Sequence, residues 1–529
     1  MTDQQVSRRQ LLTSATMAGT GALAGCLGYL PVDKGIPNDD GTSTIHVKPD
    51  GSPVNSGSED DPLGSIDRAT DFAEPGDTVH VHPGEYRERV NLTTGGTPEN
   101  PFTLTGPPEA ILRPPEGKEQ PALDITKSYT NLTGLTITGL HNSDAPEESD
   151  SYHPGKLIEI DGDLDAPDEF LEGLVVSPHR LGGAGQSLIN SVQFKDSEIG
   201  GFKVIGPAGT KWIFEDDEGH NGEIVYLGTA ANNRLDRGYE TYDRTRNIRV
   251  HHIDNSAGYP HSELVDCKAG VENITIEYCT DGGGVQSNDS YYSRAISMDA
   301  HNCTIRWNII TEPDGDCVRI GPQSYMSNVN WVDSEPQTEF ERKLGTGHSI
   351  YGNVFTGYTH EALNFLRESK RPGRDTNPRP EDQRVICNNL YDGYSDADLS
   401  TTCPSDVPSE SGIGHLGGDS PWNSTAPTMR EAFDQHALAT ELDTTVETQN
   451  SAAESEFDVS ITTTNTGDTI KEVTFELRVT SYLLESSTIE ITPGETRVIR
   501  FSHSLESPVE VAVTRNGQKI GSVRANPYS

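Results

Sequence analysis

The fold is decided by a six-residue phrase that recurs in the middle of the chain. It reads Glu223-Ile-Val-Tyr-Leu-Gly228, Glu263-Leu-Val-Asp-Cys-Lys268, Arg294-Ala-Ile-Ser-Met-Asp299, Asp316-Cys-Val-Arg-Ile-Gly321 and Glu361-Ala-Leu-Asn-Phe-Leu366, and the copies align without gaps. The third and fifth places are apolar in every copy, and side chains alternate between the two faces of a strand. We therefore predict one stacked strand per coil, with the third and fifth side chains pointing inward.

A second repeat interleaves with the first. The isoleucines Ile276, Ile305, Ile350 and Ile386 each precede by three residues a small or amide residue, namely Cys279, Asn308, Asn353 and Asn389. Their spacings of 29, 45 and 36 residues are typical of a parallel β-helix whose coils carry insertions. Stacked amides at a turn can satisfy one another's hydrogen bonds along such a coil.

The fourth and sixth places of the six-residue phrase must then point outward. Down the stack they are Tyr226, Asp266, Lys268, Ser297, Asp299, Arg319 and Asn364. Because adjacent strands lie about 4.8 Å apart, we expect these side chains to form one surface patch, which is the candidate site. Alternating charges that only stabilise the strands are the competing interpretation.

Lys268 favours the functional interpretation. It is the one lysine between Lys211 and Lys343 in a chain that otherwise uses arginine for positive charge. A lysine can lose its proton when neighbouring cations or desolvation lower its pKa, whereas an arginine cannot. Chemistry that needs an amine base would retain this lysine.

The composition excludes a basic nucleic-acid-binding protein. The 529 residues include 82 acidic and 40 basic side chains, a net charge of −42, and only 13 of the basic residues are lysines. An acidic, lysine-poor surface is typical of a protein that works in concentrated salt, so we predict a halophilic source. With 52 Gly and 33 Pro, the 32% hydrophobic content indicates turn-rich β-structure rather than disorder.

The amino terminus has the pattern of an export signal. Arg8 and Arg9 precede an uncharged stretch from Leu11 to Leu30, which predicts the twin-arginine route. Leu23-Ala24-Gly25-Cys26 resembles a lipobox, so we expect a mature protein that begins at Cys26 and is held at the cell surface by a lipid anchor alone, or secreted. The six remaining cysteines are compatible with disulfides or with buried thiols.

Segments near the start resemble one enzyme family. Thr44-Ile-His-Val-Lys-Pro-Asp-Gly, Pro62-Leu-Gly-Ser-Ile-Asp-Arg-Ala69, Pro75-Gly-Asp-Thr-Val-His-Val-His-Pro-Gly-Glu-Tyr86 and Pro101-Phe-Thr-Leu are similar to the cap and first coils of right-handed parallel β-helix polysaccharide lyases. That group contains pectate lyases, chondroitinase B and alginate lyases. The resemblance runs from about Thr44 to Asp392 and implies an enzyme that acts on an acidic polysaccharide. We expect the protein to be a monomer.

The segment Glu263-Leu-Val-Asp-Cys-Lys268 is similar to the family strand that carries a calcium-binding Glu and, five residues later, the Brønsted base. The resemblance therefore implies Lys268 as base, with Glu263 and Asp266 as Ca²⁺ ligands and Asp299 and Glu223 as additional ligands from neighbouring coils. The family's other calcium-binding Glu falls at His261. Its catalytic Arg is not at an outward place of the next coil, so Arg319 is the expected substitute.

Two alternatives remain open. Gly315-Asp316-Cys317 and Gly347-His348-Ser349 resemble polygalacturonase motifs, in which Asp299 and Asp316 would act as the pair of carboxyl groups of a hydrolase. A glycan-binding or envelope surface protein without catalysis is the second alternative. In that case Tyr291, Tyr292, Tyr325 and Trp331 would stack on sugar rings, whereas their structural role would be to cover the ends of the coils.

The carboxyl-terminal part has a different pattern. A Ser- and Pro-containing linker at 393–450 with a helix from Pro427 to Leu442 precedes strictly alternating segments such as Glu456-Phe-Asp-Val-Ser-Ile-Thr. These predict a small immunoglobulin-like β-sandwich at 451–529. The complete prediction is an all-β chain with an export signal (1–26), a tether (27–43), a right-handed parallel β-helix (44–392), the linker and the sandwich.

Overall fold

The computed structural model describes residues 43–163, 166, 168–215, 222–236, 238–285, 294–322, 325–327, 337–366, 378, 382–387, 389, 442–450, 456–466, 471–479, 482–504, 509–515 and 518–525. The export and lipidation residues Arg8, Arg9 and Cys26 lie outside these ranges, as do Tyr291, Tyr292 and Trp331. Among the described residues, no helix combines the length and apolarity needed to cross a membrane.

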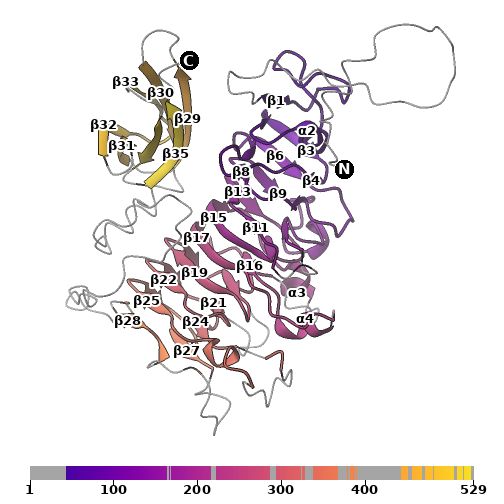
Figure 1. The fold of residues 1–529 in the computed structure, drawn as a ribbon. Helices are drawn as coiled ribbons and strands as arrows, with labels where there is room; N and C mark the ends of the chain where they lie inside the picture. Colours follow the sequence, from indigo (N-terminus) through magenta and orange to yellow (C-terminus); the bar gives the residue numbers. More distant parts are fainter. Residues whose placement is uncertain are drawn as a thin grey trace, which may run out of the picture.

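Three stacks of parallel strands form a β-helix (Figure 1). The first stack contains β1 (Thr44–Val47), β2 (Thr78–Val81), β5 (Phe102–Thr105), β8 (Thr130–Thr133), β12 (Val175–Ser177), β15 (Phe194–Val204), β17 (Arg246–Asn255), β19 (Glu272–Glu277), β22 (Thr304–Arg306), β25 (Ser349–Tyr351) and β28 (Val385–Cys387). The second contains β3 (Gly84–Arg87), β6 (Ala110–Arg113), β9 (Thr136–Thr138), β13 (Arg180–Gly182), the ends of β15 and β17, β20 (Thr280–Gly282), β23 (Ile309–Thr311) and β26 (Val354–Thr356).

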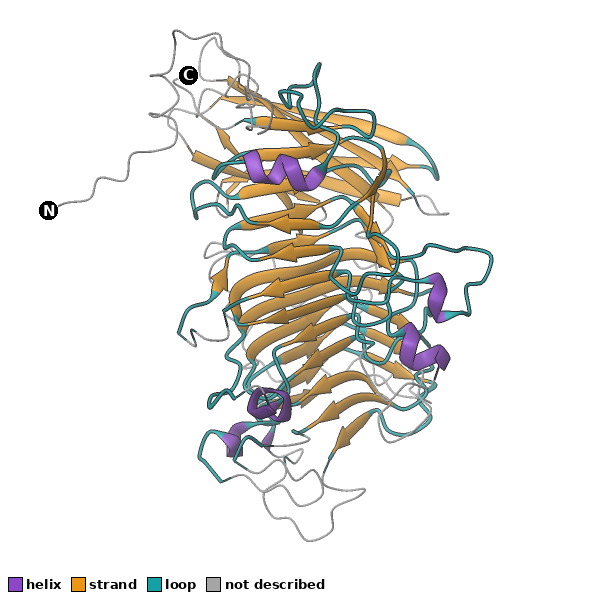
Figure 2. Cartoon of the chain, turned by 90° about the vertical axis from the view of Figure 1, so that its right-hand side faces the viewer, coloured by secondary structure: helices purple, strands orange, loops and turns teal. Residues whose placement is uncertain are grey.

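The third stack is a separate sheet and carries the candidate site. It contains β4 (Val90–Leu92), β7 (Leu123–Ile125), β10 (Ile158–Asp161), β14 (Ile189–Val192), β16 (Val225–Leu227), β18 (Val265–Cys267), β21 (Arg294–Met298), β24 (Asp316–Ile320) and β27 (Leu363–Phe365). β11 (Leu171–Glu172) pairs with the start of β15. The strands appear as successive rungs in Figure 2, and the predicted right-handed parallel β-helix is confirmed.

A short helix, α2 (Ile66–Phe72), covers the first coil. Ser65 caps it by accepting a hydrogen bond from the Arg68 backbone N–H, and Ile66 and Ala69 are buried. The other helices are α3 (Thr210–Glu215), α4 (Ala231–Asp236) and the 3-10 turns η1 (Ser149–Ser151) and η2 (Glu341–Lys343). They lie in insertions between strands of the β-helix, so the repeat itself stays regular.

The predicted amide ladder is present at the turn after the first stack. The Asn308 side chain donates to Asn353 Oδ1 at 3.0 Å, and the Asn353 side chain donates to Asn389 Oδ1 at 2.9 Å. Each of these amides also donates to a backbone carbonyl of a neighbouring coil, as Asn353 does to Ile305 O. Because all three side chains are at least nine-tenths buried, their mutual hydrogen bonds replace those lost to water.

A second ladder lies at the start of the first-stack strands β15, β17, β19 and β22 and was not predicted. Asp196, Asn247, Asn273 and Asn302 have φ between 50° and 57°, a conformation that short Asx side chains tolerate better than most residues. Their side chains form a series of hydrogen bonds. Asn247 donates to Asp196 at 2.7 Å, Asn273 donates to Asn247 at 3.2 Å, and Asn302 donates to Asn273. The two ladders fix both ends of the first-stack strands.

Four of the six cysteines settle one of the open alternatives. Cys267, Cys279, Cys303 and Cys317 are free and buried, and all four belong to the apolar core. Burial raises the pKa of Cys279 and of Cys303 to about 12, so these thiols stay protonated. For these four residues the buried-thiol interpretation is correct.

His348 gives the fold a predicted dependence on pH. Its side chain is fully buried, Nδ1 accepts a hydrogen bond from the Cys303 backbone N–H at 3.2 Å, and burial lowers the pKa of His348 to about 3. The unfolded chain binds this proton near pH 6.5 and the folded chain does not, so this stabilisation is complete above pH 6.5 and falls as the pH drops towards 3. We expect the free energy of unfolding to decrease by about 2 kcal/mol from this group between pH 6.5 and 5.

The matched variant is His348→Asn, because Asn Oδ1 can accept the same hydrogen bond without titrating. Urea denaturation at pH 7 and pH 5 should show a smaller loss of stability in His348→Asn than in the unaltered chain. An equal loss in both proteins would exclude His348 as the source.

The carboxyl-terminal unit is an antiparallel β-sandwich, as predicted. One sheet contains β29 (Leu442–Asn450), β30 (Glu456–Asn465) and β33 (Thr496–Ser504), and the other contains β32 (Tyr482–Ile491), β31 (Lys471–Val479), β34 (Val509–Arg515) and β35 (Gln518–Ala525). Val459, Phe475, Phe501 and Val513 form part of the core between them. The first strand begins at Leu442, inside the predicted linker, because all nine residues of β29 pair with β30. The predicted helix therefore cannot include Leu442, and its other residues lie outside the described ranges.

Candidate functional site

The five copies of the six-residue phrase stack in the predicted register. Val225 pairs with Val265, Val265 with Ile296, Ile296 with Val318 and Val318 with Leu363. The third-place residues of the first four copies are fully buried, so the inward face follows from the apolar pattern. The fourth places consequently form one column of Tyr226, Asp266, Ser297, Arg319 and Asn364.

The expectation that this column forms an exposed surface patch is wrong. Asp266 and Ser297 are 0% exposed, and even Lys268 is only 9% exposed. Tyr325, which was considered for sugar stacking, is buried in a small apolar cluster with Ala269 and Leu344 beside Lys268. The covering role is therefore the correct one for Tyr325, and the candidate site is a buried cluster whose outer edge is Lys268.

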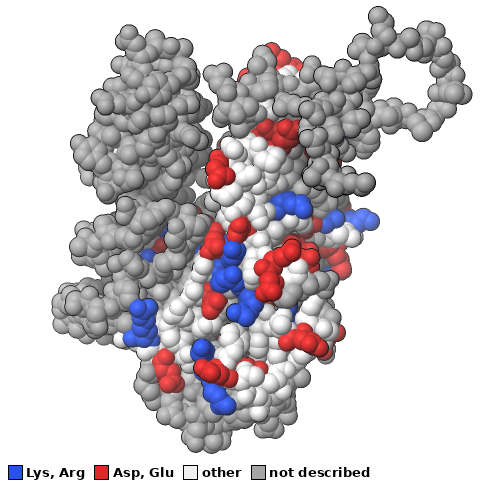
Figure 3. Space-filling model, in the orientation of Figure 1, with Lys and Arg blue, Asp and Glu red and all other residues white. Residues whose placement is uncertain are grey.

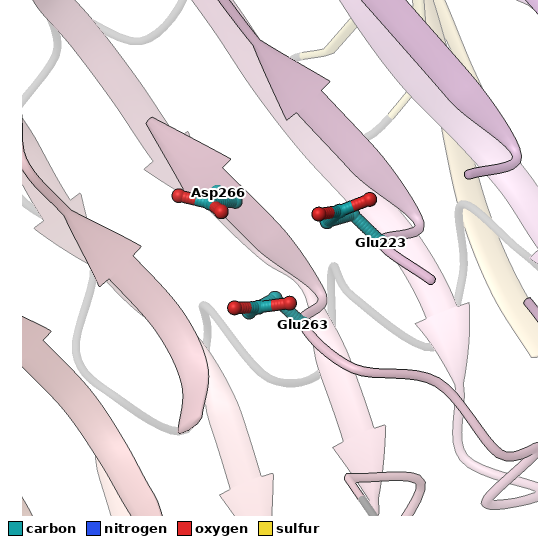
Figure 4. Close-up of side chains that lie close together, drawn as sticks. All are labelled: Glu223, Glu263 and Asp266. Atoms are coloured by element: carbon teal, nitrogen blue, oxygen red, sulfur yellow. The ribbon is translucent and has the colours of Figure 1, made fainter. Parts of the chain in front are cut away.

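Three carboxylates converge at the centre of the cluster (Figure 4). Glu223 and Glu263 each stand two residues before a third-stack strand. The Ile224 backbone N–H donates to Glu263 O at 2.8 Å, which holds the two segments that precede these strands side by side. Asp266 lies within β18. Ligand oxygens of Glu223, Glu263 and Asp266 all lie within 4.8 Å of one another, and all three residues are buried.

Two cations balance these carboxylates. Lys268 Nζ lies 2.5 Å from Asp266 Oδ2 and 4.9 Å from the centre of the Tyr226 ring. Arg294 Nη2 lies 2.6 Å from Glu263 Oε1. Sequence reasoning missed Arg294 because it occupies the first place of its phrase, whereas only the fourth and sixth places were taken as candidates for the site. The available signal was that the first place is charged in all five copies.

The proton distribution reflects this charge balance. Burial, together with Glu263 and Asp266, raises the pKa of Glu223 to about 8. Burial also raises the pKa of Asp299 to about 6. Burial would raise the pKa of Asp266 too, but Lys268, Arg294 and Arg319 together outweigh it and keep the pKa of Asp266 below its ordinary value. At pH 7 Glu223 therefore retains its proton, while Asp266 is ionised.

Lys268 does not have the lowered pKa that its proposed role suggested. Burial alone would lower it, but Asp266, Tyr226 and Asp299 outweigh burial and raise the pKa of Lys268 above its ordinary value. Arg319 shows the opposite behaviour, because burial and Arg294 lower the pKa of Arg319 to about 10. In the cation-free cluster Lys268 is thus an ammonium group paired with Asp266.

The carboxylates fit a hard divalent cation. Glu263 Oε2 and Asp266 Oδ1 are buried and have no hydrogen-bond partner in the described part of the chain, a costly state for a carboxylate unless a cation lies nearby. Carboxylate oxygen is the preferred ligand of Ca²⁺. Of the four residues predicted as ligands, Glu223, Glu263 and Asp266 converge, whereas Asp299 is not part of that group.

The contacts of His261, Arg319 and Asp299 show where the other predicted site residues lie. His261 is fully buried, and its Nε2 lies 3.1 Å from Asp281 Oδ1. It is not one of the converging ligands. Arg319 does lie next to the cluster, where its Nη2 is 3.5 Å from Ser297 Oγ. Asp299 acts electrostatically on Lys268, so these predicted residues do come together.

The hydrolase pair is not supported by the geometry. Met298 pairs with Ile320 and Arg294 pairs with Asp316, so Asp299 and Asp316 are offset by five residues along the strand direction. That offset is about 16 Å, well beyond the roughly 6.5–9.5 Å between the carboxyl groups of inverting hydrolases. Asp316 instead contacts His360 Nδ1 at 2.5 Å and Asn364 Nδ2 at 2.7 Å, a grouping that sequence reasoning did not anticipate.

Comparisons with known proteins found neither a matching family model nor a matching curated protein. Among solved structures, the chain is similar to an alginate lyase from Paenibacillus sp. str. FPU-7, with 17% identity, 62% of this chain and 95% of that chain covered, and a TM-score of 0.41. It is similar to the pectate lyase Pel9A, with 12% identity, 61% and 78% coverage and a TM-score of 0.39. A rhamnogalacturonan lyase gives 12% identity, 66% and 88% coverage and a TM-score of 0.39.

Proposed function

We propose that the protein processes polysaccharides outside the cell and cleaves a uronic-acid-containing glycan by β-elimination. The observation that carries this proposal is the convergence of Glu223, Glu263 and Asp266 beside Lys268. β-Elimination needs a base for the proton next to the uronate carboxylate and positive charge to make that proton acidic. The cluster contains residues suited to both tasks.

The roles follow from the residue chemistry. Glu223, Glu263 and Asp266 would hold Ca²⁺, which when bound would neutralise the uronate carboxylate. Arg319 supplies further positive charge from the next coils and remains a guanidinium at pH 7, since the pKa of Arg319 is lowered only to about 10. Lys268 would accept the proton at Nζ. It can exist as a neutral amine, whereas an arginine cannot, and it is more exposed than the three carboxylates and Arg319.

Lys268 must lose its proton to act as the base. In the cation-free cluster Asp266 prevents this, because it raises the pKa of Lys268. Positive charge on the three carboxylates opposes that effect, since it satisfies Asp266 and repels the ammonium group. We therefore expect the cluster to be inactive without Ca²⁺.

The cellular location and the surface charge of the protein define where and how it would meet a glycan. Four features remain predictions from sequence: the export signal with Arg8 and Arg9, the lipid anchor at Cys26, the halophilic source and the monomeric state. The surface in Figure 3 carries acidic and basic side chains side by side on the visible face rather than one large basic field. An extended acidic glycan would accordingly be recognised by local cations on the surface rather than by a continuous basic field.

The decisive assay incubates the full chain in concentrated salt with pectate, alginate or chondroitin and follows the absorbance of unsaturated uronate. We expect product with Ca²⁺ and none after chelation. New reducing ends without unsaturated product would indicate hydrolysis. Retention of the glycan without new ends would indicate a binding protein, and no reaction or binding with any of these polymers would contradict the proposal.

Glu263→Gln tests the cation site within this assay. Loss of one carboxylate charge should raise the Ca²⁺ concentration for half-maximal activity at least tenfold, about 1.4 kcal/mol, while saturating Ca²⁺ restores part of the rate. The control is Glu85→Gln on β3, whose carboxylate pairs with Arg87 on the surface. If both variants have the same Ca²⁺ dependence as the unaltered protein, Glu263 is not a ligand.

A further inference from the structure

Three histidines meet on the outward face of the first coils, far along the chain from the carboxylate cluster. His46 on β1 pairs in register with His80 on β2, and His82 stands two residues after His80, on the same side of the chain. The ring centroids are 5.7 Å apart for His46 and His80, 5.2 Å for His46 and His82, and 4.9 Å for His80 and His82. All three side chains are partly exposed, so solutes can reach them.

Two of these three separations, those of His82 from His46 and from His80, match those of rings that share a metal ion, whereas the His46 and His80 rings are about 0.5 Å too far apart. With metal–nitrogen bonds of about 2.0–2.1 Å, two ligating nitrogens are about 3.0–3.4 Å apart and ring centroids about 4.5–5.2 Å apart. His46 Nδ1 lies 3.0 Å from His82 Nε2, so one pair already has this geometry. The His80 ring lies nearly perpendicular to that of His82, at 88°, and a rotation of this ring would complete the set.

The backbone that carries the histidines is held firmly. His46 N donates to Gly57 O at 2.7 Å and His82 N donates to Val47 O at 2.9 Å. The buried Tyr86 hydroxyl donates to His82 O at 2.8 Å. Because these backbone positions are fixed, only side-chain rotation is needed to bind a ligand, which reduces the entropic cost.

The surroundings also suit a cation. Burial lowers the pKa of His46, His80 and His82, so the imidazoles are neutral at pH 7 and offer lone pairs. Glu59 lies close enough to act electrostatically on all three, while the Lys48 ammonium is drawn to the Glu59 backbone oxygen at 3.2 Å. One nearby carboxylate therefore offsets the one nearby lysine.

We propose that His46, His80 and His82 bind a divalent transition metal of the imidazole-preferring class, with Zn²⁺ as the first choice. Neutral imidazole is a common ligand of zinc, copper and nickel, and Ca²⁺ prefers oxygen. The bound metal would link β1 to the coil that follows it and stabilise the amino-terminal end of the β-helix. This inference does not depend on the proposed lyase function.

The test is a calorimetric titration of ZnCl₂ into the full chain, prepared without a polyhistidine tag and in excess Ca²⁺ to occupy the carboxylate cluster. We expect one saturable site per chain that is weakened at least tenfold in His46→Gln and in His80→Gln. The control His301→Gln removes a histidine that pairs with Glu272 elsewhere and should leave the affinity unchanged.

Electron paramagnetic resonance of the Cu²⁺-loaded unaltered protein gives a readout that does not depend on the folding of any variant. We expect couplings to several imidazole nitrogens. Absence of saturable Zn²⁺ binding, no nitrogen coupling in the Cu²⁺ spectrum, or equal affinity in a folded His46→Gln/His80→Gln double variant would overturn the proposal.

Discussion

Lys268→Arg should slow uronate cleavage by about 10³-fold while leaving the β-helix folded. The guanidinium keeps a positive charge beside the buried Asp266, but it cannot release a proton near neutral pH, so the base is lost. Removal of a general base typically costs about 10²–10⁴-fold in rate, and we expect a decrease in kcat of about 10³-fold. The measurement is the initial rate of unsaturated uronate formation at saturating Ca²⁺, with circular dichroism and thermal unfolding of the same sample.

Lys268→Met separates catalysis from stability. It removes the charge and leaves Asp266 buried with its nearest cation missing, which should decrease the free energy of unfolding by about 3 kcal/mol or more. If the cluster only stabilises the strands, Lys268→Arg will be fully stable and no uronate polymer will be cleaved by the unaltered protein. Full activity in Lys268→Arg would show that another group takes the proton.

The register of the β-helix could be predicted from sequence because it depends on a local repeat. The alternation around Val265 and its equivalents defines the inward face, and the spacing of Ile305, Ile350 and Ile386 defines the coils. Both patterns arise from one strand at a time, and stacking then aligns equivalent residues. The amide ladder at Asn308 and Asn353 follows from the same alignment.

The state of the candidate site could not be predicted in the same way. The repeat places Asp266 and Lys268 on the outward face, but whether that face meets water depends on the irregular insertions between strands. Burial in turn affects the pKa values, and for Lys268 the combined attraction of Asp266, Tyr226 and Asp299 exceeds the desolvation that was expected to lower its pKa. The partner of Glu263, Arg294, depends on side-chain reach across coils, which the apolar pattern does not describe.

Glu277→Gln should cause the largest loss of stability of any single charge removal on the first stack. The Glu277 carboxylate lies between two guanidinium groups, with Oε1 2.6 Å from Arg249 Nε and Oε2 2.6 Å from Arg306 Nε. The two cations outweigh burial and lower the pKa of Glu277, so the carboxylate stays ionised inside the protein. The amide preserves the shape but removes the counter-charge of Arg306 and the nearer of two carboxylates at Arg249. We expect a loss of about 3–5 kcal/mol in urea denaturation at pH 7.

The matched control is Glu198→Gln, because Glu198 is more exposed, at 19%, and lies 3.5 Å from Arg249 Nη1. Its other close partner is His251 Nε2 at 2.7 Å, and burial lowers the pKa of that imidazole. We expect it to cost about 1 kcal/mol or less, and the difference between the two variants to persist in concentrated salt, where exposed pairs are screened and buried pairs much less so. Equal losses in both variants would show that burial does not govern this network.

The Glu277 network also bears on why buried charges are kept in a repetitive fold. Successive coils present nearly identical apolar rungs, such as Ile276 and Ile305, so a slip by one rung would cost little apolar contact. Glu277 pairs in register with His251 on one side and Arg306 on the other, and a slip would place unlike partners together. Arg249→Met/Glu277→Leu/Arg306→Met, which removes all the charges together, should therefore lose far less stability than Glu277→Gln. If the triple variant is instead the less stable of the two, the charges contribute net stability rather than register.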